Sequence, residues 1–113
     1  MVSILDSIKK LLGVSAEDKS FDDELILHIN GALMVMTQLG VGPKTGYRIV
    51  DNTAKWADMI GGRKDLDLVV SDVYLRVRLI FDPPQNSFLV TSIQAMIKEY
   101  DWRIEEQHNR QEV

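Results

Sequence analysis

Residues 40–46, with the sequence GVGPKTG, are the segment most suggestive of chemistry, because a lysine and a threonine follow glycines as in phosphate-binding loops. In that motif glycine precedes the lysine, whereas here Pro43 precedes Lys44, and Gln38 stands where the first glycine is required. The segment also follows a predicted helix, whereas a phosphate-binding loop follows a strand. Its register therefore favours a flexible surface loop over a nucleotide site.

Residues 61–64, GGRK, are a second candidate anion site, since backbone amides at a helix start could hold a negative group together with Arg63 and Lys64. In a simpler interpretation the two glycines end the preceding helix and the two cations are solvated. We favour the simpler interpretation, because nothing else in the segment points to a ligand.

Metal and catalytic sites find little support in the residue types present. The sequence has no cysteine and only two histidines, His28 and His108, which are far apart. The lack of thiols excludes disulfides and thiolate metal sites and suits a reducing compartment. The acidic run at residues 22–24 lacks the ligand spacing of a calcium loop, and no nucleophile motif is present. We therefore expect no enzyme activity, no catalytic residues, no metal and no cofactor.

Composition limits the class of protein further. The chain has 113 residues, of which 45% are hydrophobic and 27% charged, as expected for one folded domain. Its net charge of -4 argues against a surface that grips DNA, although it allows a protein that surrounds DNA without gripping it. No apolar run reaches the roughly 18 residues of a membrane span, and the N-terminal segment lacks the pattern of a secretion signal. These features predict a protein made and folded in the cytoplasm.

Hydrophobic periodicity predicts an all-α fold, a small bundle of four to five helices with a longer C-terminal helix and one irregular glycine-rich loop. The expected helices are residues 2–12, 22–39, 53–60, 64–81 and 87–107, in a single domain covering 1–113. Within the loop of residues 40–52, residues 47–50 have the β propensity of a brief extended segment. Residues 108–113 are polar and are expected to form a frayed tail.

Local signals suggest where these helices begin and end. Ser3 and Gly13 are expected to cap the first helix, and Lys9 and Lys10 favour its C-terminal end. The apolar stripe of this helix is Ile4, Leu5, Ile8, Leu11 and Leu12. The expected N-caps of three later helices are Asp22, then Thr53 or Asn52, and Ser87.

Residues 64–81 form the predicted core helix, followed by a stop at Asp82-Pro83-Pro84. The residues at the spacing of one helix face are Leu66, Val69, Val70, Val73, Tyr74, Val77, Ile80 and Phe81. Other apolar residues exceed what one small core requires, namely Leu68, Leu75, Leu79, Leu27, Met34, Val35 and Trp102. Two explanations stay open: central helices that contact neighbouring helices on both sides, or an interface between subunits.

Several segments together resemble the small head–tail connector proteins (adaptor or head-completion proteins) of tailed bacteriophages and prophages. The matching segments are SILDSIKKLLGV, FDDELILHIN, LGVGPKTGY, WADMIGGRKDL, and VYLRVRLIFDPPQNSF followed by a helix that contains IKEYDWR. The similarity extends from about residue 3 to residue 103, and the ordered set is more specific than any one of its members.

This resemblance implies a structural, non-enzymatic, all-α virion protein at the head–tail junction, assembled in the cytoplasm of the bacterial host. It further implies a ring, dodecameric on the portal, that extends the DNA channel, helps retain packaged DNA and docks the tail or a stopper protein. The implied partners are other copies of the chain, the portal, the tail or stopper, and duplex DNA that passes without sequence-specific binding. No membrane and no cofactor are implied.

Within this hypothesis, two groups of residues are expected at contacts. The expected subunit interface comprises Leu68, Leu75, Leu79, Arg76, Arg78, Met34 and Val35, and Leu75→Glu is expected to give a folded monomer that cannot form rings. The expected docking residues for portal or tail are Trp102, Arg103, Lys44 and Tyr47.

A small DNA-binding regulator is the main alternative, with residues 53–81 as a helix-turn-helix. Against it stand the acidic net charge and a recognition-helix candidate filled with leucine and valine in place of base-reading polar residues. A helical interaction module unrelated to phages is a third interpretation.

Overall fold

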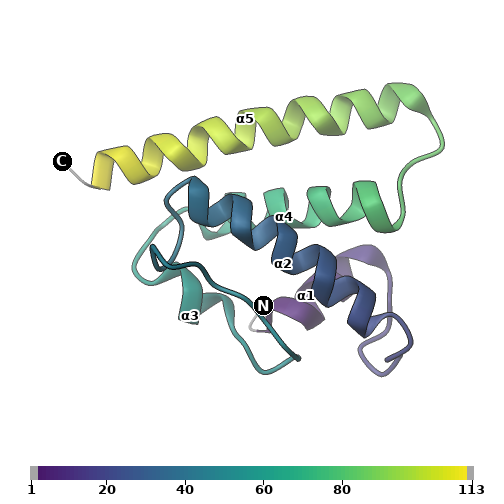
Figure 1. The fold of residues 1–113 in the computed structure, drawn as a ribbon. Helices are drawn as coiled ribbons and strands as arrows, with labels where there is room; N and C mark the ends of the chain where they lie inside the picture. The colour runs from purple at the N-terminus through teal and green to yellow at the C-terminus, as the bar shows by residue number, and fades with distance from the viewer. Residues whose placement is uncertain (1–2, 112–113) are drawn as a thin grey trace.

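The computed structural model describes residues 3–111, and over that range the chain folds into five α-helices (Figure 1). They are α1 (Ile4–Leu12), α2 (Asp22–Gln38), α3 (Trp56–Ile60), α4 (Leu66–Phe81) and α5 (Ser87–Gln111). α4 packs against α1, α2 and α5 and is therefore the central helix, as its long apolar stripe predicts. Within the described range, β structure is limited to one bridge between Ser3 and Lys55. The predicted all-α fold is confirmed.

Both predicted caps of α1 are confirmed. The Ser3 hydroxyl accepts a hydrogen bond from the Asp6 amide at 3.2 Å, and Gly13 has the left-handed φ of 81° that ends the helix. In the predicted stripe, Ile4, Leu5 and Ile8 are buried. The prediction is wrong at Leu11, which is exposed. α1 begins at Ile4, and the predicted start at Val2 lies outside the described residues.

Lys9 belongs to the interior, although the sequence indicates only a charge near the end of α1. Its side chain is fully buried, and its Nζ donates to the carbonyl oxygens of Ala16 (3.2 Å) and Asp18 (2.7 Å). The same ammonium pairs with Oδ1 of Asp22 at 2.7 Å. One buried cation therefore joins α1, the connection at residues 13–21 and the start of α2.

This ion pair changes the expected start of α2. Phe21 occupies the N-cap position and makes no side-chain capping bond, while the carboxylate of Asp22 is directed to Lys9. The prediction that Asp22 is the N-cap is therefore wrong. The Phe21 ring instead packs edge-on against Phe81, with ring centroids 5.4 Å apart, and links the start of α2 to the end of α4.

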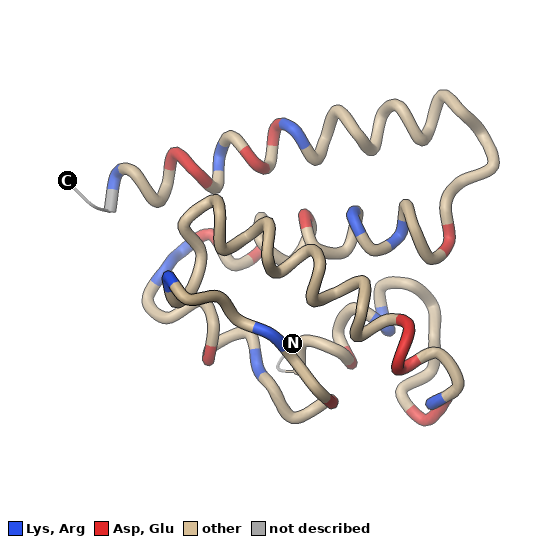
Figure 2. Tube along the Cα trace, viewed as in Figure 1, with Lys and Arg blue, Asp and Glu red and all other residues tan. Residues whose placement is uncertain are grey.

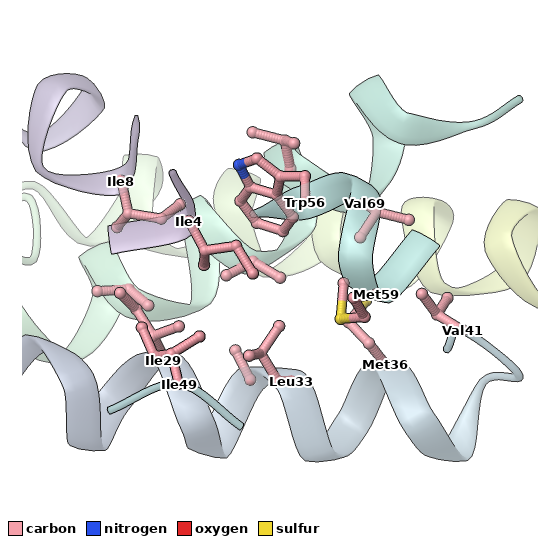
Figure 3. Close-up of a cluster of buried hydrophobic side chains, with 14 of the residues drawn as sticks. Ile4, Ile8, Ile29, Leu33, Met36, Val41, Ile49, Trp56, Met59 and Val69 are labelled. Carbon is pink, nitrogen blue, oxygen red and sulfur yellow. The ribbon is translucent and has the colours of Figure 1, made fainter. Parts of the chain in front are cut away.

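The main core lies between α1, α2, α3 and α4 (Figure 3). Its largest buried side chain is Trp56, at the start of α3, whose indole Nε1 donates to the hydroxyl of Ser7 at 2.8 Å. That hydroxyl in turn donates to the carbonyl of Ile4 at 3.0 Å. The indole nitrogen is thus satisfied inside the core.

α3 starts at Trp56 and not at Thr53, and its predicted inward residues Trp56, Met59 and Ile60 are buried.

A single side-chain amide holds the predicted extended segment at residues 47–50. No strand forms there, but Ile49 is buried, its amide donates to Oδ1 of Asn30 at 2.8 Å, and its carbonyl accepts from Nδ2 of Asn30 at 3.0 Å. The amide of Asn30 thus satisfies both backbone groups of Ile49, as a neighbouring strand would.

Replacing Asn30 by alanine is expected to lower the free energy of unfolding by about 2 kcal/mol, because the two backbone groups of Ile49 lose their partners. Urea titration followed by circular dichroism measures the change, and Gln38→Ala, at an exposed position of α2, is the matched control. A variant as stable as the control would show that Asn30 does not hold this segment.

α4 is covered on two faces. Of its 16 residues, Asp67 and Ile80 alone are classed as exposed, because α2 covers one side and α5 another. The predicted core position of Ile80 is therefore wrong. The helix-turn-helix alternative is also unsupported, since a recognition helix needs a free polar face to read base edges.

α5 has 25 residues and extends further than predicted in the C-terminal direction, to Gln111. Helix therefore continues into the predicted frayed tail at 108–113, of which residues 112–113 lie outside the described range. At the other end, the cap comes from Asn86 and not from Ser87, since Oδ1 of Asn86 accepts from the Phe88 amide at 2.8 Å. α5 packs on α4 through a second apolar cluster centred on Leu75, Ile93 and Ile97.

Arg63 also anchors α5, and the prediction that both cations of the GGRK segment are solvated is wrong for this residue. Its guanidinium is only 6% exposed, is paired with Asp65 at 2.6 Å and donates to the carbonyl oxygens of Gly40 (3.1 Å) and Ile104 (2.9 Å). The glycine-rich loop, the start of α4 and the middle of α5 therefore meet at one side chain. Because the guanidinium of Arg63 binds groups of the same chain, it is not available to an external anion.

Candidate subunit interface

Two long helical segments on one part of the molecule carry no Asp, Glu, Lys or Arg. They are residues 25–38 of α2 and residues 87–97 of α5, and charges on α5 begin only at Lys98 (Figure 2). In Figure 2 both segments are tan, while the C-terminal half of α5 alternates blue and red. These two segments are therefore uncharged, although the neighbouring helix α4 carries Arg76 and Arg78.

Large apolar side chains are exposed on these uncharged segments and at the adjacent end of α4. Six of them are between 42% and 76% exposed: Leu27, Met34, Ile80, Phe88, Leu89 and Met96. Scattered single residues of this kind are ordinary, but their concentration on uncharged helices is typical of a surface that becomes buried in an assembly.

A groove of about 490 Å³ runs between α2, α4 and α5 on this surface. We call it the apolar groove. Its lining is mainly aliphatic, with the polar side chains His28, Arg76 and Gln94, and comprises Leu27, His28, Gly31, Ala32, Val35, Arg76, Leu79, Ile80, Gln94 and Ile97. A concave, mainly aliphatic surface with few polar groups is suited to receive apolar side chains.

Arg76 is held at the groove by two carboxyl groups. Its Nε donates to Oδ1 of the fully buried Asp72 at 2.7 Å, and its second amine pairs with Asp101 on α5. Burial, together with hydrogen bonding to Asp101, raises the pKa of Asp72 to about 8, against the opposing effect of Arg76. Oδ2 of Asp72 and Oδ1 of Asp101 are both buried without a hydrogen-bond donor. Arg76 is thus committed within the subunit.

The predicted interface residues occupy different environments. Leu75 is only 6% exposed, so the premise that it lies off the subunit's own core is wrong, because α5 packs over that face of α4. Leu75→Glu would place a charge inside this packing and is not a clean test of ring formation. Leu68, Leu79 and Val35 are half-buried against the apolar clusters.

The two remaining predicted interface residues differ from each other. Arg78 is half-buried, and its guanidinium lies 3.4 Å from the hydroxyl of Tyr74. Met34 is 65% exposed and is the member of the predicted set that offers a large apolar side chain to a partner. The interface role of the whole set stays a prediction.

Sequence reasoning missed four of the exposed apolar residues as interface residues: Ile80, Phe88, Leu89 and Met96. Ile80 recurs at the helical spacing of the predicted core stripe of residues 64–81, which assigned it to the interior. The signal that could have found three of them is the lack of any charge over residues 87–97, which is unusual for a helix with one solvated face.

The predicted docking residues do not form one patch. Trp102 is 62% exposed and lines a small hollow with Arg103, which lies 3.8 Å from Glu99 on the solvated side of α5. Lys44 lines a different hollow, next to the C-terminal turns of α5. Tyr47 is half-buried against the main core, and burial raises the pKa of its hydroxyl. Their docking role stays a prediction.

Two further features concern metal binding and membrane spans in the described part of the chain. Among residues 3–111, no three His, Cys, Asp or Glu side chains are grouped so that they could hold a metal ion. None of the helices in this range is both long enough and apolar enough to cross a bilayer.

Comparison with known proteins identifies the family. The family model of phage connector proteins matches residues 4–111, from the first residue of α1 to the last of α5. No curated protein and no solved structure matches the sequence. The family match covers nearly the whole chain and includes every residue of the apolar groove. The chain therefore belongs to the phage connector protein family.

Proposed function

We propose that copies of this protein form a ring between the portal and the tail of a phage particle, where the ring extends the DNA channel and helps retain packaged DNA. The family gives the protein a structural role as a connector in the phage particle, alongside other virion proteins. The observation that carries the ring is the mainly apolar surface of α2, α4 and α5, on which six large apolar side chains are between 42% and 76% exposed.

The location of the apolar side chains supports association of several copies. They lie on three helices that are fixed by the core or by the α4–α5 packing, so the surface is rigid before a partner arrives. A preorganised surface loses little conformational freedom on binding, and apolar residues at its centre provide most of the gain on burial. This supports a stable subunit contact of the kind a ring requires.

The charge of the protein supports a passive role towards DNA. The net charge is -4, and the charged half of α5 interleaves acids and bases without a basic stripe. A channel wall without a dense set of phosphate-binding cations lets DNA slide, whereas many such contacts would hold it. A structural, non-enzymatic role is consistent with the connector family.

Phage particles assembled without this protein test the proposed function. We expect heads that package DNA but lose it and carry no tail, with both defects corrected when the wild-type chain is supplied in trans. Electron microscopy and nuclease sensitivity of the packaged DNA measure the outcome. Tailed, infectious particles without the protein would overturn the proposal, and salt-sensitive binding of the purified monomer to duplex DNA would favour a regulator.

A further inference from the structure

We propose that Leu89 and Met96, on α5 of one copy, insert into the apolar groove of the next copy. We call these two residues the apolar ridge. This inference rests on the proposed function, because it names the contact from which the ring would be built. It follows from where the ridge and the groove lie on the same helix, from their lengths and from their lack of free charge.

The ridge and the groove lie on different flanks of α5. Gln94 and Ile97 line the groove, and Met96 lies about 160° from Gln94 and about 100° from Ile97 around the helix, at about 100° per residue. Leu89 is seven residues before Met96 and therefore lies within about 20° of it on the same flank. Two different surfaces that meet between copies can pair head to tail, which generates a ring when the rotation closes.

The lengths of the two surfaces agree. Along α2, the groove extends from Leu27 to Val35, nine residues with a rise of about 12 Å between the first and the last. The ridge extends over eight residues of α5, with a rise of about 10 Å between Leu89 and Met96. Two apolar side chains two turns apart on one helix can therefore both enter the groove of a neighbour.

The chemistry of the groove favours an uncharged occupant. Its one arginine, Arg76, is already neutralised by Asp72 and Asp101, and His28 lies 3.8 Å from Glu24. A charged segment would be desolvated there without a free partner, which is costly. Residues 87–97 carry no charge, so the ridge of a second copy can enter without burying one.

Two single substitutions separate the ridge from the groove. Met96→Glu disables the ridge and Leu27→Glu disables the groove, and both positions are exposed, so both variants keep the fold. Each variant alone is expected to associate more than about tenfold more weakly than the wild-type chain, because a carboxylate enters an apolar contact. Native mass spectrometry, with and without portal, measures the species, and Ala57→Glu, exposed on α3 outside both surfaces, is the control.

Mixing the two variants gives the decisive result. The Leu27→Glu chain keeps an intact ridge and the Met96→Glu chain keeps an intact groove, so the mixture is expected to form a heterodimer that stops at two subunits. A mixture that stays monomeric, or a Met96→Glu chain that dimerises alone, would overturn the inference.

Engineered cysteines provide a second test that does not depend on the charged variants. The natural chain has no cysteine, so a chain with Leu27→Cys and Met96→Cys is expected to form disulfides between copies and to give a ladder of oligomers on oxidation. If the double-cysteine chain forms rings as the wild-type chain does but gives no ladder on oxidation, the inference is overturned. Rings that persist in both glutamate variants would overturn this contact and leave the proposed function standing, whereas a wild-type chain that never oligomerises would overturn both.

Discussion

The Asp72→Asn variant is expected to be more stable than the wild-type chain at pH 8 and to lose most of the wild-type decline in stability between pH 5 and pH 8. Asp72 is fully buried between α4 and α5, and its pKa is raised to about 8 in the folded state. In the unfolded chain an aspartate has a pKa of about 3.9. At a pH between these two pKa values, the Asp72 carboxyl is deprotonated in the unfolded chain and protonated in the folded chain.

The sign of the effect follows from this difference. The contribution of Asp72 to stability is fully present below about pH 4 and is lost as the pH rises towards 8, with a slope of up to about 1.4 kcal/mol per pH unit. Asparagine is neutral throughout this range and can still accept a hydrogen bond from Arg76, so the slope from this position should disappear.

Urea denaturation at several pH values between 5 and 9 measures the effect. Asp67→Asn is the control, because Asp67 is an exposed acid on the same helix. If the Asp72→Asn and wild-type chains show the same slope, the buried carboxyl does not hold the proton, and our account of the contact between α4 and α5 is wrong.

The second large effect is expected for Lys9→Met, which should lower the free energy of unfolding by about 3 kcal/mol. The methionine nearly fills the volume of the lysine stem but cannot donate, so the carbonyls of Ala16 and Asp18 and the carboxylate of Asp22 lose their shared partner. For a chain of this length the melting temperature should fall by about 10 °C.

Lys10→Met is the matched control for this prediction. Lys10 is the next residue of α1, but it is exposed, so its replacement should change stability by less than about 0.5 kcal/mol. Differential scanning calorimetry of both variants checks the pair. Equal melting temperatures for Lys9→Met and Lys10→Met would show that the buried ammonium does not join α1 to α2.

Much of the fold could be predicted from the sequence, because its local signals agree. Ser3 and Gly13 cap α1 as expected, since a cap depends only on residues within one turn. The expected stripe of α4 is buried at Val69, Val73 and Val77. Positions decided by contacts distant in sequence were not predictable, as Lys9 shows, because its partners come from a loop and from the next helix.

The candidate site was predicted less well than the fold, for a reason of the same kind. Periodicity shows that a residue shares a face with others, but it does not show how far the covering helix extends. α5 has 25 residues, about 37 Å, whereas α4 has 16, about 24 Å, so α5 is longer than the helix that it covers. Leu75 on α4 is covered because Ile93 and Ile97 of α5 pack over it, whereas Phe88 and Leu89 lie on a side of α5 that stays exposed.

Electron microscopy of this protein mixed with purified portal tests the central claim most directly. We expect a ring of copies stacked coaxially on the portal, with an open channel continuous with that of the portal and with α2 and the first half of α5 buried between neighbouring subunits. Monomers scattered on the portal, or a complex in which these helices face solvent, would contradict it.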